Sequence, residues 1–166
     1  MGEMQVGEGF VGDGADAAHV NTVLGPRDGP VGAAWATALA TPRAGHVPFV
    51  AVLQPGLAVK PATLFVNKAA IESERHGTLT RGAAQAGVAA GVAEALATGV
   101  IDRDSVDELL LIAAVWVNPA AADEEAVFAN NREATLTALR NGRDGLPAID
   151  EVLAARADPR NPFFGA

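Results

Sequence analysis

The sequence has 166 residues, which is enough for one domain with a hydrophobic core but short for two. Its 20 acidic and 12 basic residues give a net charge of −8, which argues against a nucleic-acid or anionic-membrane surface, because phosphate groups bind clustered Lys and Arg. The absence of cysteine excludes disulfides and thiolate metal sites. No stretch resembles a signal peptide or a membrane span. We therefore expect a single cytoplasmic domain over residues 1–166, with no nucleic-acid or membrane partner.

An N-terminal β-hairpin is predicted from the pattern of the first 24 residues. The first strand, over residues 3–12, contains Gly7 and Gly9, which indicate either a bulge or a close contact between backbones. The Gly-Asp-Gly turn at 12–14 then leads into a second strand over residues 18–24.

The second strand carries the first candidate functional residues. Side chains alternate along a strand, so Val20 faces one side of the sheet, whereas His19 and Asn21 face the other. A histidine and an amide that project together suit a ligand pocket. The alternative is that His19 is an ordinary core or surface histidine that makes one hydrogen bond.

The rest of the chain alternates between strand and helix patterns. The elements predicted after the hairpin are, in order, a helix (31–41), a buried strand (47–54), an extended segment (62–68), a segment that suits a strand or a helix equally well (69–75), an Ala- and Gly-rich helix (80–98), a strand buried on both faces (109–117) and two helices (123–141 and 146–156). This order favours an α/β fold, a two-layer sandwich of a mixed sheet covered by helices.

Few residues offer chemistry outside the second strand. The 3 histidines form no metal-binding motif, so we expect no metal, and no nucleotide-binding loop or serine nucleophile motif occurs. Lys60 and Lys68 are the only lysines among the 12 basic residues. In a chain that otherwise uses arginine, a lysine indicates a need for a compact cation. A solvated strand end explains Lys60 equally well, whereas we favour a functional role for Lys68.

Four blocks, in order along the chain, resemble the formaldehyde-activating enzyme family, the tetrahydromethanopterin hydro-lyases. The blocks are VGEGFVGDGADAAHVN with GPRDGP, then KPATLFVNKAAI, then GAAQAGVAAGVAEAL and finally NNREAT, and the resemblance runs from about Val6 to Phe164. It implies a fold like domain 2 of ribosomal protein S five, and a homopentamer with active sites between neighbouring subunits. It also implies condensation of formaldehyde with tetrahydromethanopterin to methylene-tetrahydromethanopterin and water, in one-carbon metabolism or formaldehyde detoxification. The pterin is a co-substrate, and no permanently bound cofactor is expected.

The resemblance also assigns roles to individual residues. The general acid of the family falls on His19, and the positions that contact the pterin fall on Asn21, Val50, Lys68, Ala70 and Gln85. The family usually has aspartate at the position of Asn21 and threonine at that of Ala70. Asparagine keeps the hydrogen bonding but loses the charge that raises the pKa of a neighbouring histidine, and alanine loses a hydroxyl contact.

Three hypotheses about function remain open at this point. The protein is a formaldehyde-activating enzyme, a non-catalytic protein that binds a pterin or formaldehyde, or a lyase that acts on a different amine carrier. We expect the ring of His19 to lie in a pocket with Lys68 and Gln85.

Overall fold

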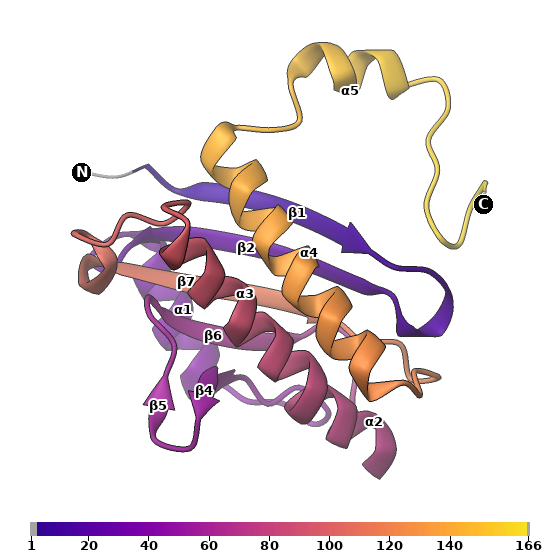
Figure 1. The fold of residues 1–166 in the computed structure, drawn as a ribbon, viewed down its shortest axis with the longest axis horizontal. Coiled ribbons are helices and arrows are strands. Elements are labelled where there is room, and N and C mark those ends of the chain that lie inside the picture. The colour runs from indigo at the N-terminus through magenta and orange to yellow at the C-terminus, as the bar shows by residue number, and fades with distance from the viewer. Residues whose placement is uncertain (1–2, 166) are drawn as a thin grey trace.

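A mixed five-stranded sheet forms the centre of the computed structural model, which describes residues 3–165 (Figure 1). The strand order is β1 (Gln5–Val11), β2 (Ala18–Pro26), β7 (Leu109–Trp116), β6 (Ala62–Asn67) and β3 (Phe49–Val50). Only the β6–β7 pair is parallel, and the other neighbours are antiparallel. The predicted N-terminal hairpin and mixed sheet are thus confirmed.

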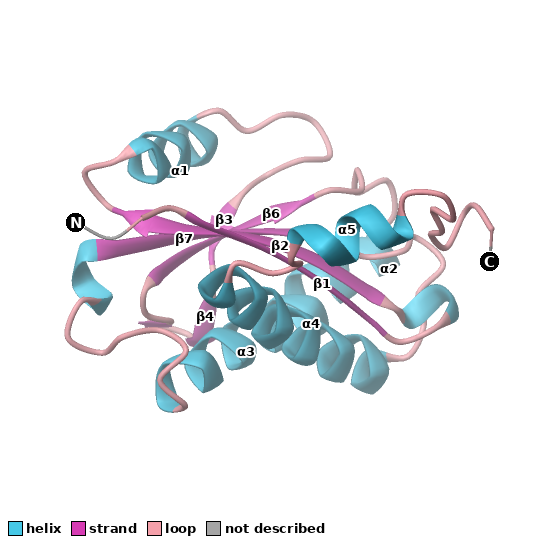
Figure 2. Cartoon of the chain, turned by 90° about the horizontal axis from the view of Figure 1, so that it is seen from above, coloured by secondary structure: helices cyan, strands magenta, loops and turns pink. Residues whose placement is uncertain are grey.

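Helices cover the two faces of the sheet unequally. In Figure 2, α3 (Gln85–Ala97) and α4 (Glu124–Asp144) lie along one face, and α1 (Pro30–Ala40) lies on the other. Helix α2 (Glu74–Leu79) and a π-helical turn (Thr80–Ala84) lead directly into α3. The last helix, α5 (Ile149–Ala155), stands away from the sheet, as Figure 1 shows. The fold is therefore the predicted α/β sandwich, with its main helical layer on one side.

Glycines in β1 let α4 lie close to the sheet. A Cβ atom on Gly7 would lie 1.8 Å from the backbone oxygen of Ala138, and one on Gly9 would lie 2.2 Å from that of Ala134. Any side chain there would push the helix away. Strand β1 keeps an unbroken register with β2, so these glycines mark a close backbone contact rather than a bulge.

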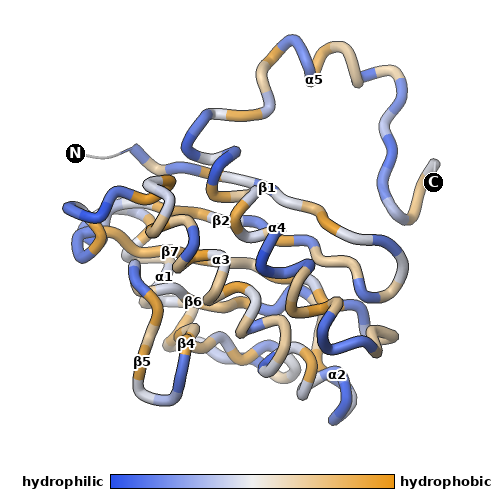
Figure 3. Tube along the Cα trace, in the orientation of Figure 1, coloured by the Kyte–Doolittle hydropathy of each residue, from blue (hydrophilic) through white to orange (hydrophobic). Residues whose placement is uncertain are grey.

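The core lies between the sheet and the α3–α4 layer. Figure 3 shows hydrophobic residues concentrated along the central strands. Leu111, Ala113 and Val115 of β7 are fully buried on the helix side, whereas Ile112 and Trp116 are only half buried on the opposite side. The prediction that this strand is buried on both faces is therefore wrong, because α1 leaves part of the opposite face uncovered.

Two predicted segments differ from the structure. Residues 47–54 form two short strands, β3 and β4 (Val52–Gln54), instead of one buried strand; β4 pairs with β5 (Leu57–Ala58) in a separate hairpin. Val47 and Leu53 are 49% and 44% exposed, because Val47 precedes the edge strand β3 and Leu53 lies in the separate β4–β5 hairpin. Residues 69–73 are neither strand nor helix, and α2 begins after Ser73, whose hydroxyl accepts the backbone N–H of His76.

The remaining elements are short or follow the prediction closely. The 3-10 turns lie at Gly14–Asp16 and Val106–Glu108. Helix α4 begins after Asp123, whose carboxylate accepts the backbone N–H groups of Glu125 and Ala126, and it runs three residues past the predicted end at 141. Within residues 3–165, no helix has both the length and the hydrophobicity needed to cross a membrane.

Candidate active site

A cavity of about 690 Å³ opens on the sheet face opposite α3 and α4. Its polar wall is formed by Glu8, His19, Asn21 and Lys68, and its apolar wall by Phe10, Trp116, Pro162 and Phe163. The strand register places these side chains together. Phe10, His19 and Trp116 are aligned across β1, β2 and β7, and Glu8 is aligned with Asn21. Aligned residues in neighbouring strands point to the same face, so the pairing of strands alone assembles most of this site.

Lys68 joins the site from the end of β6. Its backbone N–H donates to the carbonyl of Val115 at 2.8 Å, which continues the β6–β7 pairing by one residue. Its Nζ atom donates to Oδ1 of Asn21 at 2.7 Å and lies 3.2 Å from Nδ1 of His19. The predicted association of His19, Asn21 and Lys68 is thus present in the geometry of a single chain.

The two ring nitrogens of His19 face groups of opposite charge. Nδ1 lies next to the Lys68 ammonium, and Nε2 lies 3.0 Å from Oε1 of Glu8. An ammonium group has only hydrogen atoms to donate, so Nδ1 accepts from Lys68. The proton of the neutral ring is therefore on Nε2, where it is donated to the Glu8 carboxylate.

The surroundings of His19 favour its neutral form. Burial lowers the pKa of His19 below its ordinary value of 6.5, the positive charge of Lys68 lowers it further, and the carboxylate of Glu8 opposes both effects. Burial also lowers the pKa of Lys68, again against the effect of Glu8. The site therefore holds two basic groups close enough that protonation of one affects the other.

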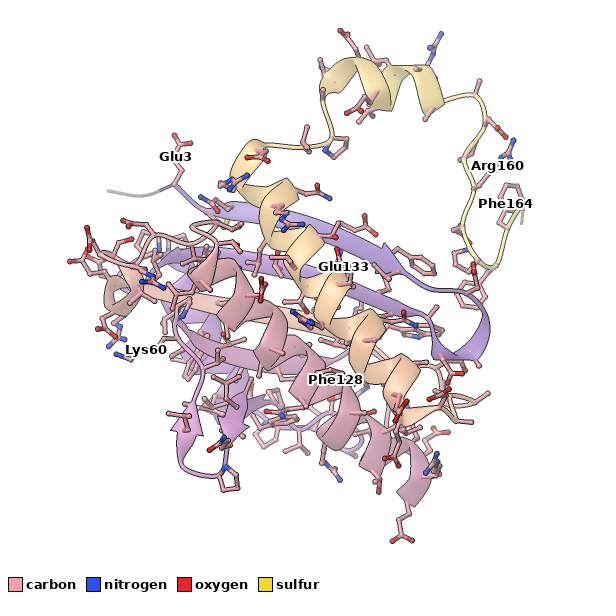
Figure 4. The ribbon with its side chains drawn as sticks, in the orientation of Figure 1. Glu3, Lys60, Phe128, Glu133, Arg160 and Phe164 are labelled. Carbon is pink, nitrogen blue, oxygen red and sulfur yellow. The ribbon has the colours of Figure 1, made fainter. Side chains whose placement is uncertain are left out.

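The C-terminal segment closes one side of the cavity. After α5, the chain turns back towards the end of β1, and Figure 4 labels Arg160 and Phe164 on this returning segment. The ring of Phe163 meets Trp116 edge to face, with 5.9 Å between centroids. The ring of Phe10 lies 5.8 Å from that of His19. These aromatic side chains give the cavity an apolar side that suits a flat ring system.

Sequence reasoning missed several of these residues. The signal for Glu8 and Phe10 was available, because both alternate with Gly7 and Gly9 in the first strand and so share one face. Trp116 and the C-terminal segment carry no comparable signal in the sequence. No local pattern indicates that either lies beside His19.

The other residues predicted to contact the pterin lie elsewhere. Gln85 begins α3, and its Oε1 accepts the backbone N–H of Val52 at 2.6 Å. Val50 belongs to β3, and Ala70 follows Lys68 in a loop beside Gly45. None of the three lines the cavity around His19, and β7 and β6 separate β3 from β2. The expectation that Gln85 shares the pocket of His19 is therefore not met within one chain.

The other histidines and Lys60 take structural positions. Nδ1 of His46 lies 2.9 Å from the carbonyl of Asn67, and Nε2 of His76 lies 2.8 Å from that of Val117. Lys60 pairs with Asp107 on the surface. In the described part of the chain, no three His, Cys, Asp or Glu side chains gather as they would around a metal ion. The contacts of His19 with Lys68 and Glu8 offer acid–base chemistry and hydrogen bonding.

Comparisons with known proteins connect this site to one family. The model of the family described as "Formaldehyde-activating enzyme (Fae)" matches residues 6–164. A Methanosarcina barkeri protein named "5,6,7,8-tetrahydromethanopterin hydro-lyase" is 40% identical over 158 residues, which cover 95% of this chain and 89% of the relative.

Longer relatives share the same region. A protein named "Bifunctional enzyme Fae/Hps" from Archaeoglobus fulgidus is 37% identical over 98% of this chain, and one from Methanosphaera stadtmanae is 35% identical over 97%. These matches cover 41% and 40% of the two relatives, so this chain spans about two fifths of each. A family match over nearly the whole chain, together with the similarity to the hydro-lyase over most of both chains, shows that this protein belongs to the formaldehyde-activating enzyme family.

Proposed function

We propose that the protein condenses formaldehyde with tetrahydromethanopterin, giving methylene-tetrahydromethanopterin and water. The proposal is carried by one observation, the placement of His19 between a carboxylate and an ammonium group inside a cavity with aromatic walls. Similarity to a named hydro-lyase over most of both chains favours an enzyme over a non-catalytic binding protein. It also favours tetrahydromethanopterin over a different amine carrier.

The chemistry needs an acid at one step. An amine of the pterin adds to formaldehyde to form a carbinolamine, whose hydroxyl leaves poorly at neutral pH. The imidazolium of His19 donates a proton to this oxygen, the C–O bond breaks, and water and an iminium ion form. The second amine attacks the iminium carbon and loses a proton, which restores the imidazolium. Holding both amines near one carbon contributes mainly through proximity.

The neighbouring residues bind and orient the pterin. Lys68 and Asn21 offer a donor and an amide to its polar groups, and Phe10 and Trp116 provide an apolar surface for its ring. Overall, the reaction replaces the C=O double bond of formaldehyde with two C–N bonds, without oxidation or reduction. We therefore propose that the pterin acts as a co-substrate and that no permanently bound cofactor takes part.

The positions of Val50 and Gln85 support a homo-oligomer, which we propose to be a pentamer. Val50 is at the β3 edge of the sheet and Gln85 contacts β4, whereas His19 is on β2 near the β1 edge. Neighbouring strands lie about 4.8 Å apart, so the edges are too distant to form one small site within a chain. A head-to-tail ring would bring one edge of each subunit to the opposite edge of the next. Both groups of residues would then contact the same pterin.

The deciding experiment measures formaldehyde consumption with tetrahydromethanopterin. The purified protein should accelerate the reaction above the spontaneous rate, and tetrahydrofolate serves as the comparison carrier. If the protein accelerated the reaction with tetrahydrofolate but not with tetrahydromethanopterin, tetrahydromethanopterin would not be the carrier. Binding of tetrahydromethanopterin without any acceleration would favour the non-catalytic alternative. Light scattering checks the oligomer, since a monomer at micromolar concentration would contradict the ring.

A further inference from the structure

Glu8 contacts His19 from the neighbouring strand but has no part in the steps described above. Its oxygen lies 3.0 Å from Nε2, and the side chain is 58% exposed. The β1–β2 register pairs Glu8 with Asn21 and Phe10 with His19, so Glu8 is the diagonal neighbour of His19 on the same face. A long side chain spans such a diagonal. The register of the hairpin therefore places Glu8 within reach of His19.

This contact determines which nitrogen of His19 exchanges a proton. With Nε2–H donated to Glu8, the neutral ring has only Nδ1 free to take up another proton. Nδ1 accepts from Lys68 in the free protein, so the ring is protonated only after the Lys68 ammonium leaves it. A polar group of the ligand that binds Lys68 would draw it away. The carboxylate of Glu8 then stabilises the imidazolium by its charge and its hydrogen bond.

We propose that Glu8 is a positioning residue for His19, which keeps Nε2 protonated so that Nδ1 takes up and gives up the catalytic proton. The kinetic part of this assignment rests on the proposed function of His19 as general acid. After the imidazolium gives its Nδ1 proton to the carbinolamine oxygen, the ring returns to the same neutral form. Proton loss from the second amine then protonates Nδ1 again, and Glu8 itself neither gains nor loses a proton.

Among residues 3–165, three charged groups besides the ring itself line the cavity around His19. Glu8 comes from β1, Lys68 follows β6, and Arg160 belongs to the C-terminal segment, where it also pairs with Asp158. Arg160 and Lys68 are positive, so Glu8 is the only one of the three whose charge favours the imidazolium. Replacing it should therefore move the titration of His19 in one direction only.

The test is a titration of the ¹⁵N-labelled protein without substrate, observed through the histidine ring nitrogens. Glu8→Gln keeps an oxygen that accepts from Nε2 but removes the charge. We expect it to lower the pKa of His19 by about 0.2–0.7 pH unit, the range for an ion pair that solvent reaches. Lys68→Met frees Nδ1, and the neutral ring should still carry its proton on Nε2, because Glu8 holds it there. His46 and His76, which contact backbone carbonyls elsewhere, are internal references.

Glu3→Gln is the matched control, since it removes the same charge before the start of β1, at the end opposite the cavity (Figure 4). It should leave the titration of His19 unchanged. An unshifted His19 in Glu8→Gln, or a neutral ring protonated on Nδ1 in Lys68→Met, would overturn the assignment. These titrations require no catalytic activity, so their outcome is independent of the test of the proposed reaction. In the active enzyme, Glu8→Gln should move the alkaline limb of the kcat/KM profile, which reports the free enzyme, to lower pH.

Discussion

The Nζ atom of Lys68 lies 3.2 Å from Nδ1 of His19, although 49 residues separate them in the chain. With Lys68 as an ammonium, this contact requires a neutral imidazole, because a protonated Nδ1 has no lone pair to accept from it. The free site is therefore held in a form that is not yet an acid. Ligand binding that draws the Lys68 ammonium away from Nδ1 would then make protonation of His19 easier.

Acid should destabilise the protein partly through His19. Burial and Lys68 lower its pKa below 6.5, so folding favours the neutral ring. This contribution to stability is fully present above the unfolded-state pKa and is lost as the pH falls through the folded-state pKa. The urea midpoint between pH 7.5 and 5 should fall more steeply for the wild type than for His19→Gln. If the urea midpoints of the two proteins changed with pH in parallel, His19 would have the same pKa in the folded and unfolded states.

His19→Ala should reduce turnover by about 10²–10⁴-fold, the usual contribution of general acid catalysis. The side chain is 35% exposed, so the fold should survive its loss. The rate is measured against the uncatalysed reaction, and circular dichroism and light scattering check the fold and the assembly. Full activity in this variant would rule out His19 as the acid.

Lys68→Met should have two effects that can be separated. Removal of the positive charge raises the pKa of His19, so the alkaline limb of the pH–rate profile should move to higher pH. Loss of the ammonium should also weaken pterin binding, which is measured directly by calorimetry. Lys60→Met is the matched control, because Lys60 pairs with Asp107 on the surface and should change neither quantity. If Lys68→Met bound the pterin as tightly as the wild type, Lys68 would have no role in pterin binding.

Asn21→Asp restores the residue that the family usually has. The new carboxylate would take the place of the Asn21 oxygen that lies 2.7 Å from Lys68, and it would add a negative charge near His19. Both the partial neutralisation of Lys68 and the added charge raise the pKa of His19. Activity should therefore extend to higher pH than in the wild type. A shift of the alkaline limb to lower pH would contradict this account.

Gly9→Ala should destabilise the fold without touching the cavity. The added methyl group would lie 2.2 Å from the backbone oxygen of Ala134, so α4 must shift. Overpacking of this kind costs about 1–3 kcal/mol. Gly82→Ala is the control, because a methyl group there meets no atom within 4 Å. Urea unfolding measures the stability of both variants. If Gly9→Ala were as stable as Gly82→Ala, helix α4 would be able to move on β1 without loss of stability.

The local elements and the sidedness of the second strand were open to prediction from the sequence. Alternation placed His19 and Asn21 on one face, because side chains in a strand alternate whatever its neighbours are. The helix after Asp123 could be predicted because its cap is a contact between residues close in sequence. Gly7 and Gly9 indicated a close backbone approach without showing which element makes it.

Only the tertiary structure decided which residues surround His19. The positions of Glu8 and Trp116 depend on β2 lying between β1 and β7, and Lys68 reaches the site because β6 pairs with β7. The edge position of β3 exposed a segment whose composition predicted burial. Strand order and the return of the C-terminal segment depend on contacts between distant parts of the chain, which local periodicity does not encode.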